Sequence, residues 1–339
     1  MRNIIMAAVA AILATSTMAH ARDSISIVGS STVYPFATIV AEKFGQSSGF
    51  KTPVIESTGT GGGMKLFCGG VGTDKPDFTN ASRAIKKSEL ELCASNGVTP
   101  VEFVVGNDGL AFASSSSATP MNLDIAHIAA ALASELNGET NPLTTWAEVD
   151  AFVAKQTNTE LLGLPNRPIS VMIPPPTSGT RDAMGELFMK NGWKALGFKD
   201  KGYKSIREDG RAIEMGENDN LIVEKLVGDA EMFGVFGYSF FDTNRDKVQA
   251  AKLNGVELNF DNISSYEYPG ARPLFFYAKA EHVGVIPGME QFVQEFISEQ
   301  AMSMDGYLFP AGLVPLSDKD FATQVAQRNK LVNKQLASN

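Results

Sequence analysis

The stretch SISIVGSSTVYPFATIVAEKF, residues 24–44, contains a complete strand, turn and helix signal. Apolar residues alternate through Ile25 and Ile27, which predicts a half-buried strand. The polar run 29–32 follows, and beyond Pro35 apolar residues recur at helical spacing. Proline is favoured in the first turn of a helix, because its missing N–H would have no partner there. A strand, a hydroxyl-rich turn and a helix are therefore expected in this order.

The same plan recurs at three later places, in residues 53–67, 77–92 and 169–188. Strands that alternate with helices are typical of parallel α/β sheets, so the predicted fold class is α/β. The turns have the chemistry of an anion site, because the first turn of a helix has unpaired N–H groups and hydroxyls add neutral donors. Any single turn is also explained by ordinary helix capping. Together, the four turns predict one anion held where they converge.

Composition indicates a folded protein of about two domains. The chain has 339 residues, of which 44% are apolar and 20% charged. Lys and Arg number 29 against 38 Asp and Glu, so the net charge is −9. Nucleic acid is therefore not an expected partner, because its binding depends on a basic surface.

The amino-terminal segment has the features of a secretory signal. Arg2 supplies a positive charge, residues 4–13 are apolar, and Ala19-His20-Ala21 matches a cleavage site. The alternative is a membrane anchor, but the apolar run is shorter than the ~20 residues that span a bilayer. We expect a cleaved signal peptide at residues 1–21 and a periplasmic location.

The chain has two cysteines, Cys68 and Cys93, and both lie in the exported part. In an oxidising compartment they are expected to form one disulfide, which would stabilise the fold by roughly 3 kcal/mol in the chain-entropy model. The alternatives are two buried thiols or a metal site, although the CxxC spacing of zinc sites is absent.

Catalytic and nucleotide-binding motifs do not match this sequence. The glycines at 59–63 fit neither the GxGxxG fingerprint nor a P-loop, because Met64 interrupts both patterns. Residues 45–49 match GxSxG but follow a helix rather than a strand, which is the wrong context for a nucleophile. The exported part has two histidines, His127 and His282, and no HExxH motif. No enzymatic activity, metal or other cofactor is predicted.

Six short motifs follow one another along the exported part. They are Gly29-Ser30-Ser31-Thr32-Val33-Tyr34-Pro35-Phe36, Thr58-Gly59-Thr60-Gly61-Gly62-Gly63, Asn80-Ala81-Ser82-Arg83, Asp108-Gly109, Thr177-Ser178-Gly179-Thr180-Arg181 and Phe236-Gly237-Tyr238. In order and spacing they resemble the signatures of the periplasmic phosphate-binding proteins of high-affinity phosphate ABC transporters, the PstS family. The resemblance implies a type II periplasmic-binding-protein fold, in which a two-stranded hinge joins two α/β lobes and the ligand cleft lies between them.

The order of the predicted strands and the family resemblance together predict the boundaries of the two lobes. Lobe I is expected to comprise residues 22–105 and 266–325, and lobe II residues 106–265. The return crossing would lie at residues 261–272, and residues 326–339 would form a C-terminal tail.

The resemblance also implies ligands for the anion. The matching positions are the hydroxyls of Ser31, Thr32, Thr60, Ser178 and Thr180, and the backbone N–H groups of Val33, Tyr34 and Gly179. The best-known members have an Asp in the third loop and an Arg before the Ser-Gly-Thr loop. Here Arg83 stands in place of that Asp, and residues 174–176 are prolines in place of that Arg. Arg83 is therefore expected to make a two-pronged contact with the anion and to supply most of the positive charge. Arg181 is a second candidate, unless it pairs with Asp182 or Glu186 on its own helix.

The missing Asp leaves open which group accepts the proton of hydrogen phosphate. Asp108 is the first choice because it follows the predicted strand 101–105, and Glu217 or Asp219 are the alternatives. Sulfate carries no proton at neutral pH, so an acceptor would discriminate against it. Without an acceptor, sulfate or another oxyanion becomes a credible ligand.

The resemblance implies a monomer that captures inorganic phosphate and delivers it to a membrane permease. The alternatives are an exported binder of another tetrahedral oxyanion, or an exported phosphate-ester hydrolase that uses the same anion site. The scarcity of histidine and the absence of an activated nucleophile in the sequence favour a binding protein over a hydrolase.

Overall fold

The computed structural model describes residues 22–176, 178–216 and 219–333. The predicted signal peptide, Glu217 and the side chain of Asp219 lie outside the described part.

Lobe I is built from the strand, turn and helix plan that the sequence predicted. Strand β1 (Ser26–Gly29) pairs in parallel with β2 (Val54–Ser57) and with β3 (Phe78–Ala81). Helices α1 (Tyr34–Ser47), α2 (Gly59–Phe67) and α3 (Lys87–Ser95) follow the three strands in turn. The GxSxG match at residues 45–49 is the end of α1, as expected. Later helices α11 (Met289–Phe296), α12 (Glu299–Met302) and α13 (Asp318–Val332) complete the lobe.

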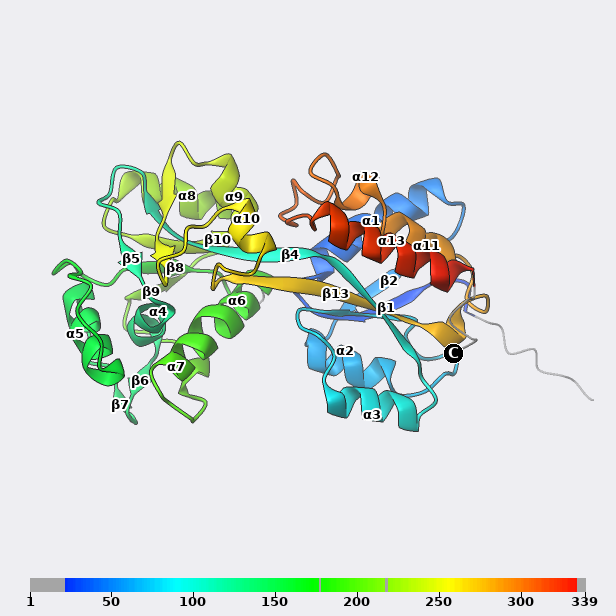
Figure 1. Cartoon of the computed structure of the whole chain (residues 1–339), viewed down its shortest axis with the longest axis horizontal. Helices are drawn as coiled ribbons and strands as arrows, with labels where there is room; N and C mark the ends of the chain where they lie inside the picture. Colours follow the sequence, from blue (N-terminus) through cyan, green and yellow to red (C-terminus); the bar gives the residue numbers. More distant parts are fainter. Residues whose placement is uncertain (1–21, 177, 217–218, 334–339) are drawn as a thin grey trace, which may run out of the picture.

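Two long strands join the lobes (Figure 1). Strand β4 (Pro100–Ser115) pairs through residues 100–109 with β13 (Ala271–Lys279), and through residues 110–114 with β10 (Phe233–Gly237). The resulting sheet has the order β2-β1-β3-β13-β4-β10-β8-β9. One sheet therefore runs through both lobes, and β4 and β13 form the hinge between them.

Lobe II repeats the parallel arrangement. Strand β8 (Val171–Ile173) lies between β10 and β9 (Ala212–Glu214) and is parallel to both, while β11 (Val248–Ala250) pairs with β4. Its helices are α4 (Ile125–Leu132), α5 (Trp146–Thr157), α6 (Gly179–Met184), α7 (Asn191–Ala195), α8 (Asp219–Gly228) and α9 (Tyr238–Thr243). A π-helical segment η1 (Gly185–Lys190) joins α6 to α7, and a short 3-10 helix η2 (Gly202–Lys204) follows. Helix α10 (Phe260–Ser264) precedes the return strand.

Each lobe has its own apolar core. In lobe I, Phe78 stacks on Phe276 with ring centroids 4.7 Å apart, and in lobe II Phe112 stacks on Phe233 at the same distance. Burying one such ring contributes about 2 to 3 kcal/mol. None of the described helices has the length and apolar character needed to cross a membrane.

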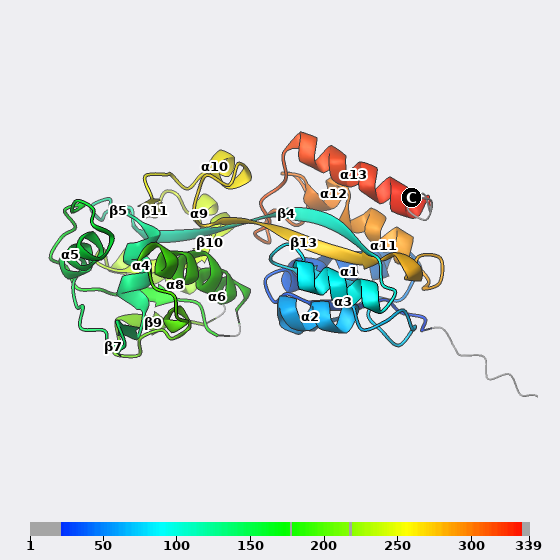
Figure 2. The same ribbon diagram turned by 60° about the horizontal axis from the view of Figure 1, so that its bottom comes forward.

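The end of lobe I differs from the predicted division. The proposed boundary at residue 325 falls inside α13, which lies along lobe I (Figure 2). Leu331 is 2% exposed and belongs to the lobe I core, so this part of the predicted tail belongs to the lobe.

The predicted disulfide is present between Cys68 and Cys93. Cys68 caps the carboxyl end of α2, and Cys93 lies in α3. The bridge therefore ties together the two helices that follow β2 and β3. Both sulfurs lie in a small apolar cluster that includes Phe67 and Tyr277.

Candidate functional site

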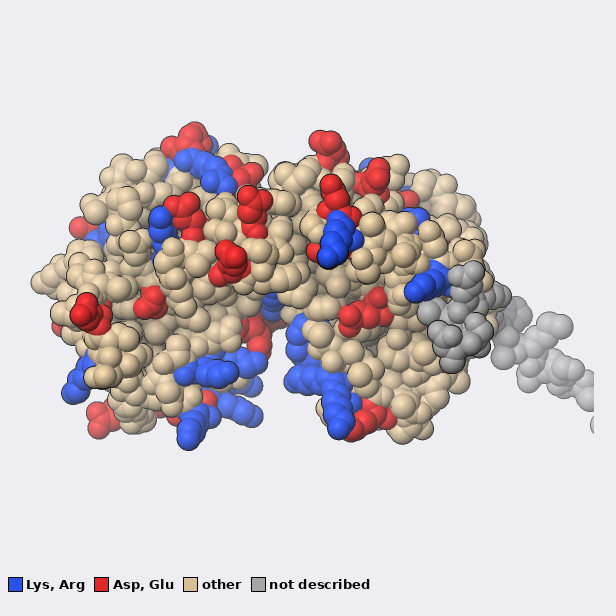
Figure 3. Space-filling model, in the orientation of Figure 1, with Lys and Arg blue, Asp and Glu red and all other residues tan. Residues whose placement is uncertain are grey.

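A cleft of about 560 Å³ lies between the lobes, and Figure 3 shows lysine and arginine side chains on both sides of the gap. Lobe I and the hinge line it with Ser30, Thr60, Gly61, Ser82, Arg83 and Arg272. Lobe II lines it with Arg181, Asp182, residues 184–187, Asn191, Tyr203, Lys204 and Ile206. Of the predicted ligands, Thr60, Arg83 and Arg181 line this cleft. The others are not among its lining residues, and they are Ser31, Thr32, Val33, Asp108, Ser178, Gly179 and Thr180.

The parallel strands bring the lobe I turns together at one sheet edge. Gly29 has a φ of +126°, and a Cβ there would lie 2.2 Å from the carbonyl oxygen of Asn80. Only glycine permits this approach of β1 to β3. Gly63 likewise permits the close approach of α2 to β1, since a Cβ added there would lie 2.5 Å from the Cα of Gly29. The turns after β1 and β3 and the start of α2 are thereby held side by side.

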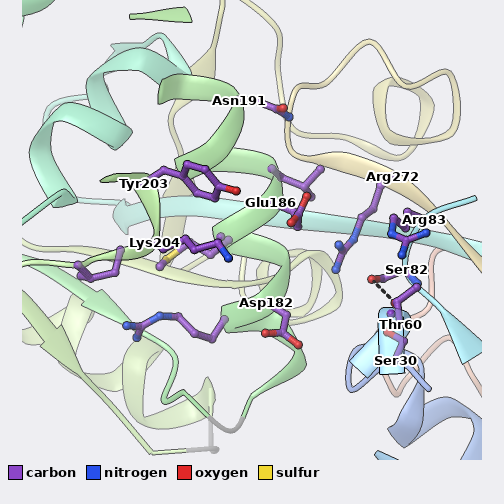
Figure 4. A pocket seen from close by; sticks show the side chains of 16 residues that line it. Ser30, Thr60, Ser82, Arg83, Asp182, Glu186, Asn191, Tyr203, Lys204 and Arg272 are labelled. Carbon is purple, nitrogen blue, oxygen red and sulfur yellow. Dashed lines mark hydrogen bonds between the residues drawn. The ribbon is translucent and has the colours of Figure 1, made fainter. Parts of the chain in front are cut away.

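Two hydroxyl groups form a pair on the lobe I wall. The hydroxyls of Thr60 and Ser82 lie 3.2 Å apart, and the Ser82 N–H donates to Thr60 Oγ1 at 3.1 Å (Figure 4). Thr60 was predicted as a ligand. Ser82 was not, although it belongs to the motif at residues 80–83 that carries the resemblance.

Arg83 lines the cleft but already has a carboxylate partner. Its Nη1 and Nη2 donate to Glu89 Oε2 and Oε1 at 2.9 and 2.7 Å, and Glu89 also accepts from the Lys86 N–H at 2.8 Å. The hydrogen bonds to Glu89 raise the pKa of Arg83, despite the opposing effect of its partial burial. The guanidinium is therefore held at the cleft wall by a group that the sequence analysis missed.

Arg272 is a second arginine on this wall, and it was not predicted as a ligand. It lies on β13 opposite Asp108 of β4, and its side chain is 8% exposed. Its Nε donates to Asp108 Oδ2 at 3.1 Å and its Nη2 to Thr32 Oγ1 at 3.0 Å. Burial raises the pKa of Asp108, and the charge of Arg272 opposes this. Asp108 therefore orients Arg272 from behind the wall and is not part of the cleft lining.

The two loops predicted to hold the anion meet where the lobes touch. The Thr32 hydroxyl donates to the carbonyl oxygen of Gly179 at 3.1 Å, and a Cβ on Gly179 would lie 2.5 Å from the Cα of Thr32. The Ser31 hydroxyl bonds to the carboxylate of Asp182. Ser178 caps α6 by accepting from the N–H of Thr180 at 3.1 Å.

Two backbone assignments depend on the start of α1. The Tyr34 N–H, which was predicted to donate to the ligand, donates to the carbonyl oxygen of Ser30 at 3.0 Å. This bond closes the first turn of the helix. Val33 is the residue before α1, and it is fully buried in lobe I.

Arg181 pairs neither with Asp182 nor with Glu186. It lies 3.2 Å from Glu214 on β9, and its Nη1 donates to the carbonyl oxygen of Pro174 at 2.7 Å. Asp182 and Glu186 instead line the cleft, so the lobe II wall carries both charge signs.

The described residues contain no group of three or more His, Cys, Asp or Glu side chains able to hold a metal ion. Both histidines of the described part bond to carboxylates inside the lobes, His127 to Asp150 at 3.3 Å and His282 to Asp77 at 2.6 Å. Each is at most 2% exposed, and neither lines the cleft.

Two α/β lobes, a two-stranded hinge and a polar cleft between the lobes define a solute-binding protein of the periplasmic type, as the sequence predicted. A family model described as PBP superfamily domain matches residues 14–300, and the chain belongs to this superfamily.

The chain is similar to two curated proteins over most of its length. It is 29% identical to Protein SphX of Synechococcus elongatus, over 89% of this chain and 81% of that protein. It is 26% identical to Phosphate-binding protein PstS of Staphylococcus saprophyticus, over 90% of this chain and 84% of that protein. A crystal structure described as a possible phosphate binding protein from Planctomyces limnophilus superimposes with a TM-score of 0.73 at 26% identity, over 91% of this chain and 98% of that one.

Proposed function

We propose that this protein is an extracytoplasmic solute-binding protein that captures inorganic phosphate and delivers it to the permease of an ABC transporter. The observation that carries the proposal is the convergence of hydroxyl groups and three arginines, Arg83, Arg181 and Arg272, on one cleft between the lobes. The similar proteins named as phosphate-binding point to the same ligand.

The phosphate seat consists of the hydroxyl pair Thr60 and Ser82, the guanidinium groups of Arg83 and Arg272, and the loops that meet at Thr32 and Gly179. Arg272 is the central cation, because it is more deeply buried than Arg83, at 8% against 31% side-chain exposure. Charge–anion interactions strengthen as water is excluded. The other predicted ligands, Ser31, Val33, Ser178, Thr180 and Arg181, complete the seat with hydroxyl, backbone and guanidinium donors from both lobes.

Asp182 is the group that accepts the proton of hydrogen phosphate. It lines the cleft and bonds to Ser31 across the lobe boundary, whereas Asp108 is taken up by Arg272. A carboxylate facing the ligand stabilises a protonated anion and repels sulfate. Selectivity for phosphate thus depends on a residue of lobe II.

Export, release to a permease and a monomeric state belong to the same proposal. Cleavage after Ala21 would leave Arg22 as the first residue, and its guanidinium is fixed by Asp77 and by the carbonyl oxygen of Ser24 at 2.7 Å. Amino-terminal sequencing of the protein from a periplasmic fraction should therefore begin at Arg22.

Isothermal titration of mature protein freed of bound ligand tests the central activity. We expect one phosphate per chain and much weaker binding of sulfate. Equal affinity for both anions would reject Asp182 as the selective acceptor, and absence of phosphate binding would reject the function. If an activity that hydrolyses a generic phosphate ester followed the protein through purification, it would instead favour a hydrolase.

A further inference from the structure

The lining of the cleft extends beyond the loops that are predicted to hold the anion. The lobes already touch at Thr32 and Gly179, yet a cavity of about 560 Å³ remains beside this contact. The lobe II residues from Asn191 to Ile206 that line the cleft lie outside the motifs that carry the resemblance.

Three polar side chains on that wall have no assigned role. Asn191 begins α7, while Tyr203 and Lys204 belong to η2, which packs against η1. Within the described ranges, the Asn191 amide, the Tyr203 hydroxyl and the Lys204 amino group have no hydrogen bond or ion pair to another residue. Figure 4 shows the Tyr203 hydroxyl and the Lys204 amino group extending toward the cleft.

Apolar groups accompany these polar ones. Leu187 and Ile206 line the same part of the cleft. Inorganic phosphate has no apolar surface that would gain from such a lining, whereas a short carbon chain does. Polar donors beside apolar groups are suited to a ligand that has hydroxyl groups on a carbon chain.

We propose that the lobe II wall is a second subsite, which binds the hydroxylated organic part of a small phosphomonoester. This inference rests on the proposed function, because the phosphoryl group of the ester would occupy the phosphate seat. The carboxylates Asp182 and Glu186 on the same wall accept hydrogen bonds from hydroxyls and would repel a second anionic group. These acceptors are suited to the hydroxyl groups of a polyol ester.

Glycerol 3-phosphate is the probe for this subsite. Isothermal titration on ligand-free protein measures its affinity and that of inorganic phosphate for the wild type, Tyr203→Phe and Lys204→Gln. Lys201→Gln is the matched control, because Lys201 is an exposed lysine of the same loop that does not line the cleft. Wild-type protein should bind one glycerol 3-phosphate per chain, and saturating phosphate should abolish this binding.

Each of the two subsite variants should lower the ratio of ester affinity to phosphate affinity about fivefold to tenfold, as expected for one lost hydrogen bond. The control should change the ratio by less than about twofold. Phosphate binding without any ester binding overturns the second subsite and leaves the proposed function intact. Ester binding with the same ratio in all variants also overturns the subsite, whereas failure to bind either ligand overturns the proposed function itself.

Discussion

The two walls of the cleft are built differently. On lobe I and the hinge, Arg83 is paired with Glu89 and Arg272 with Asp108. The two arginines line the cleft, and their carboxylate partners do not. On lobe II the carboxylates themselves line it, as Asp182 shows. The comparison teaches that the carboxylates of lobe I lie behind their arginines, whereas lobe II exposes carboxylates to the cleft together with Arg181 and Lys204. In the proposed function, the exposed carboxylate of Asp182 accepts a hydrogen bond from a protonated anion.

The carboxylate behind each arginine fixes the orientation of its guanidinium group. A guanidinium held by Nε or by two Nη atoms has little rotamer freedom left to lose when the ligand binds. Because the pairs reduce the net positive charge of the wall, we expect directed hydrogen bonds from the guanidinium groups to add to their charge in holding an anion. The contrast between the walls can be tested residue by residue.

Replacement of Arg272 should have the largest effect. Arg272→Gln should weaken phosphate binding about 100-fold or more, because it removes a buried charged donor. The double variant Arg272→Gln, Asp108→Asn restores a neutral pair behind the wall, so its thermal midpoint without ligand should approach that of the wild type. Phosphate binding should stay weak in both proteins. Recovery of binding in the double variant would contradict a direct role for Arg272.

Arg83 should contribute less than Arg272, because it is more exposed. Arg83→Ala should weaken phosphate binding about 10- to 100-fold in titration calorimetry, and Arg83→Lys should recover only part of this, since lysine lacks the planar fork. A loss greater than that of the Arg272 variant would restore the original expectation that Arg83 carries most of the charge.

Asp182→Asn should change selectivity more than affinity. The amide no longer repels an unprotonated anion, so the ratio of phosphate to sulfate affinity should fall about tenfold. Glu186→Gln is the control on the same wall, because Glu186 is paired with Lys190 at 2.5 Å. Equal changes in the two variants would show that general repulsion, rather than proton acceptance, sets the selectivity.

Substitution of Lys279, a residue of lobe I, should change the pH dependence of stability and leave ligand binding almost unaltered. It is fully buried, its Nζ donates to the carbonyl oxygen of Gly70 at 2.7 Å, and burial lowers its pKa to about 8. Asp77 and Glu281 nearby oppose this shift, and Arg22 adds to it. Because the folded state binds this proton less tightly than the unfolded chain, its burial destabilises the fold below pH 8.

Between about pH 8 and pH 10.5 the folded protein has released this proton while the unfolded chain still holds it, so the destabilisation is relieved as the pH rises. The free energy of unfolding of the wild type, measured against Lys279→Met, should rise by up to about 3 kcal/mol over this range. Phosphate affinity at pH 7 should differ less than about twofold. A flat stability difference across the range would show that Lys279 is not held as a buried charge.

Local patterns predicted much of the fold. The turns after β1 and β3, the start of α2 and the disulfide follow from residues close together in the chain. The pairing of Arg83 with Glu89 could also have been predicted from the sequence, since only six positions separate the two residues. Arg272 lies 164 positions from Asp108, which the antiparallel pairing of β4 with β13 brings opposite it. It lies 240 positions from Thr32, which follows β1 and comes near through the pairing of β1 with β3 and of β3 with β13. No local pattern could indicate either contact.

A crystal structure of the phosphate complex tests the division of roles between the walls most directly. We expect the anion against the Thr60 and Ser82 hydroxyls, with an Arg272 Nη atom donating to one oxygen and the Asp182 carboxylate accepting from another. Phosphate bound to Arg181 and Lys204 on lobe II, without contact to Arg272, would contradict this account.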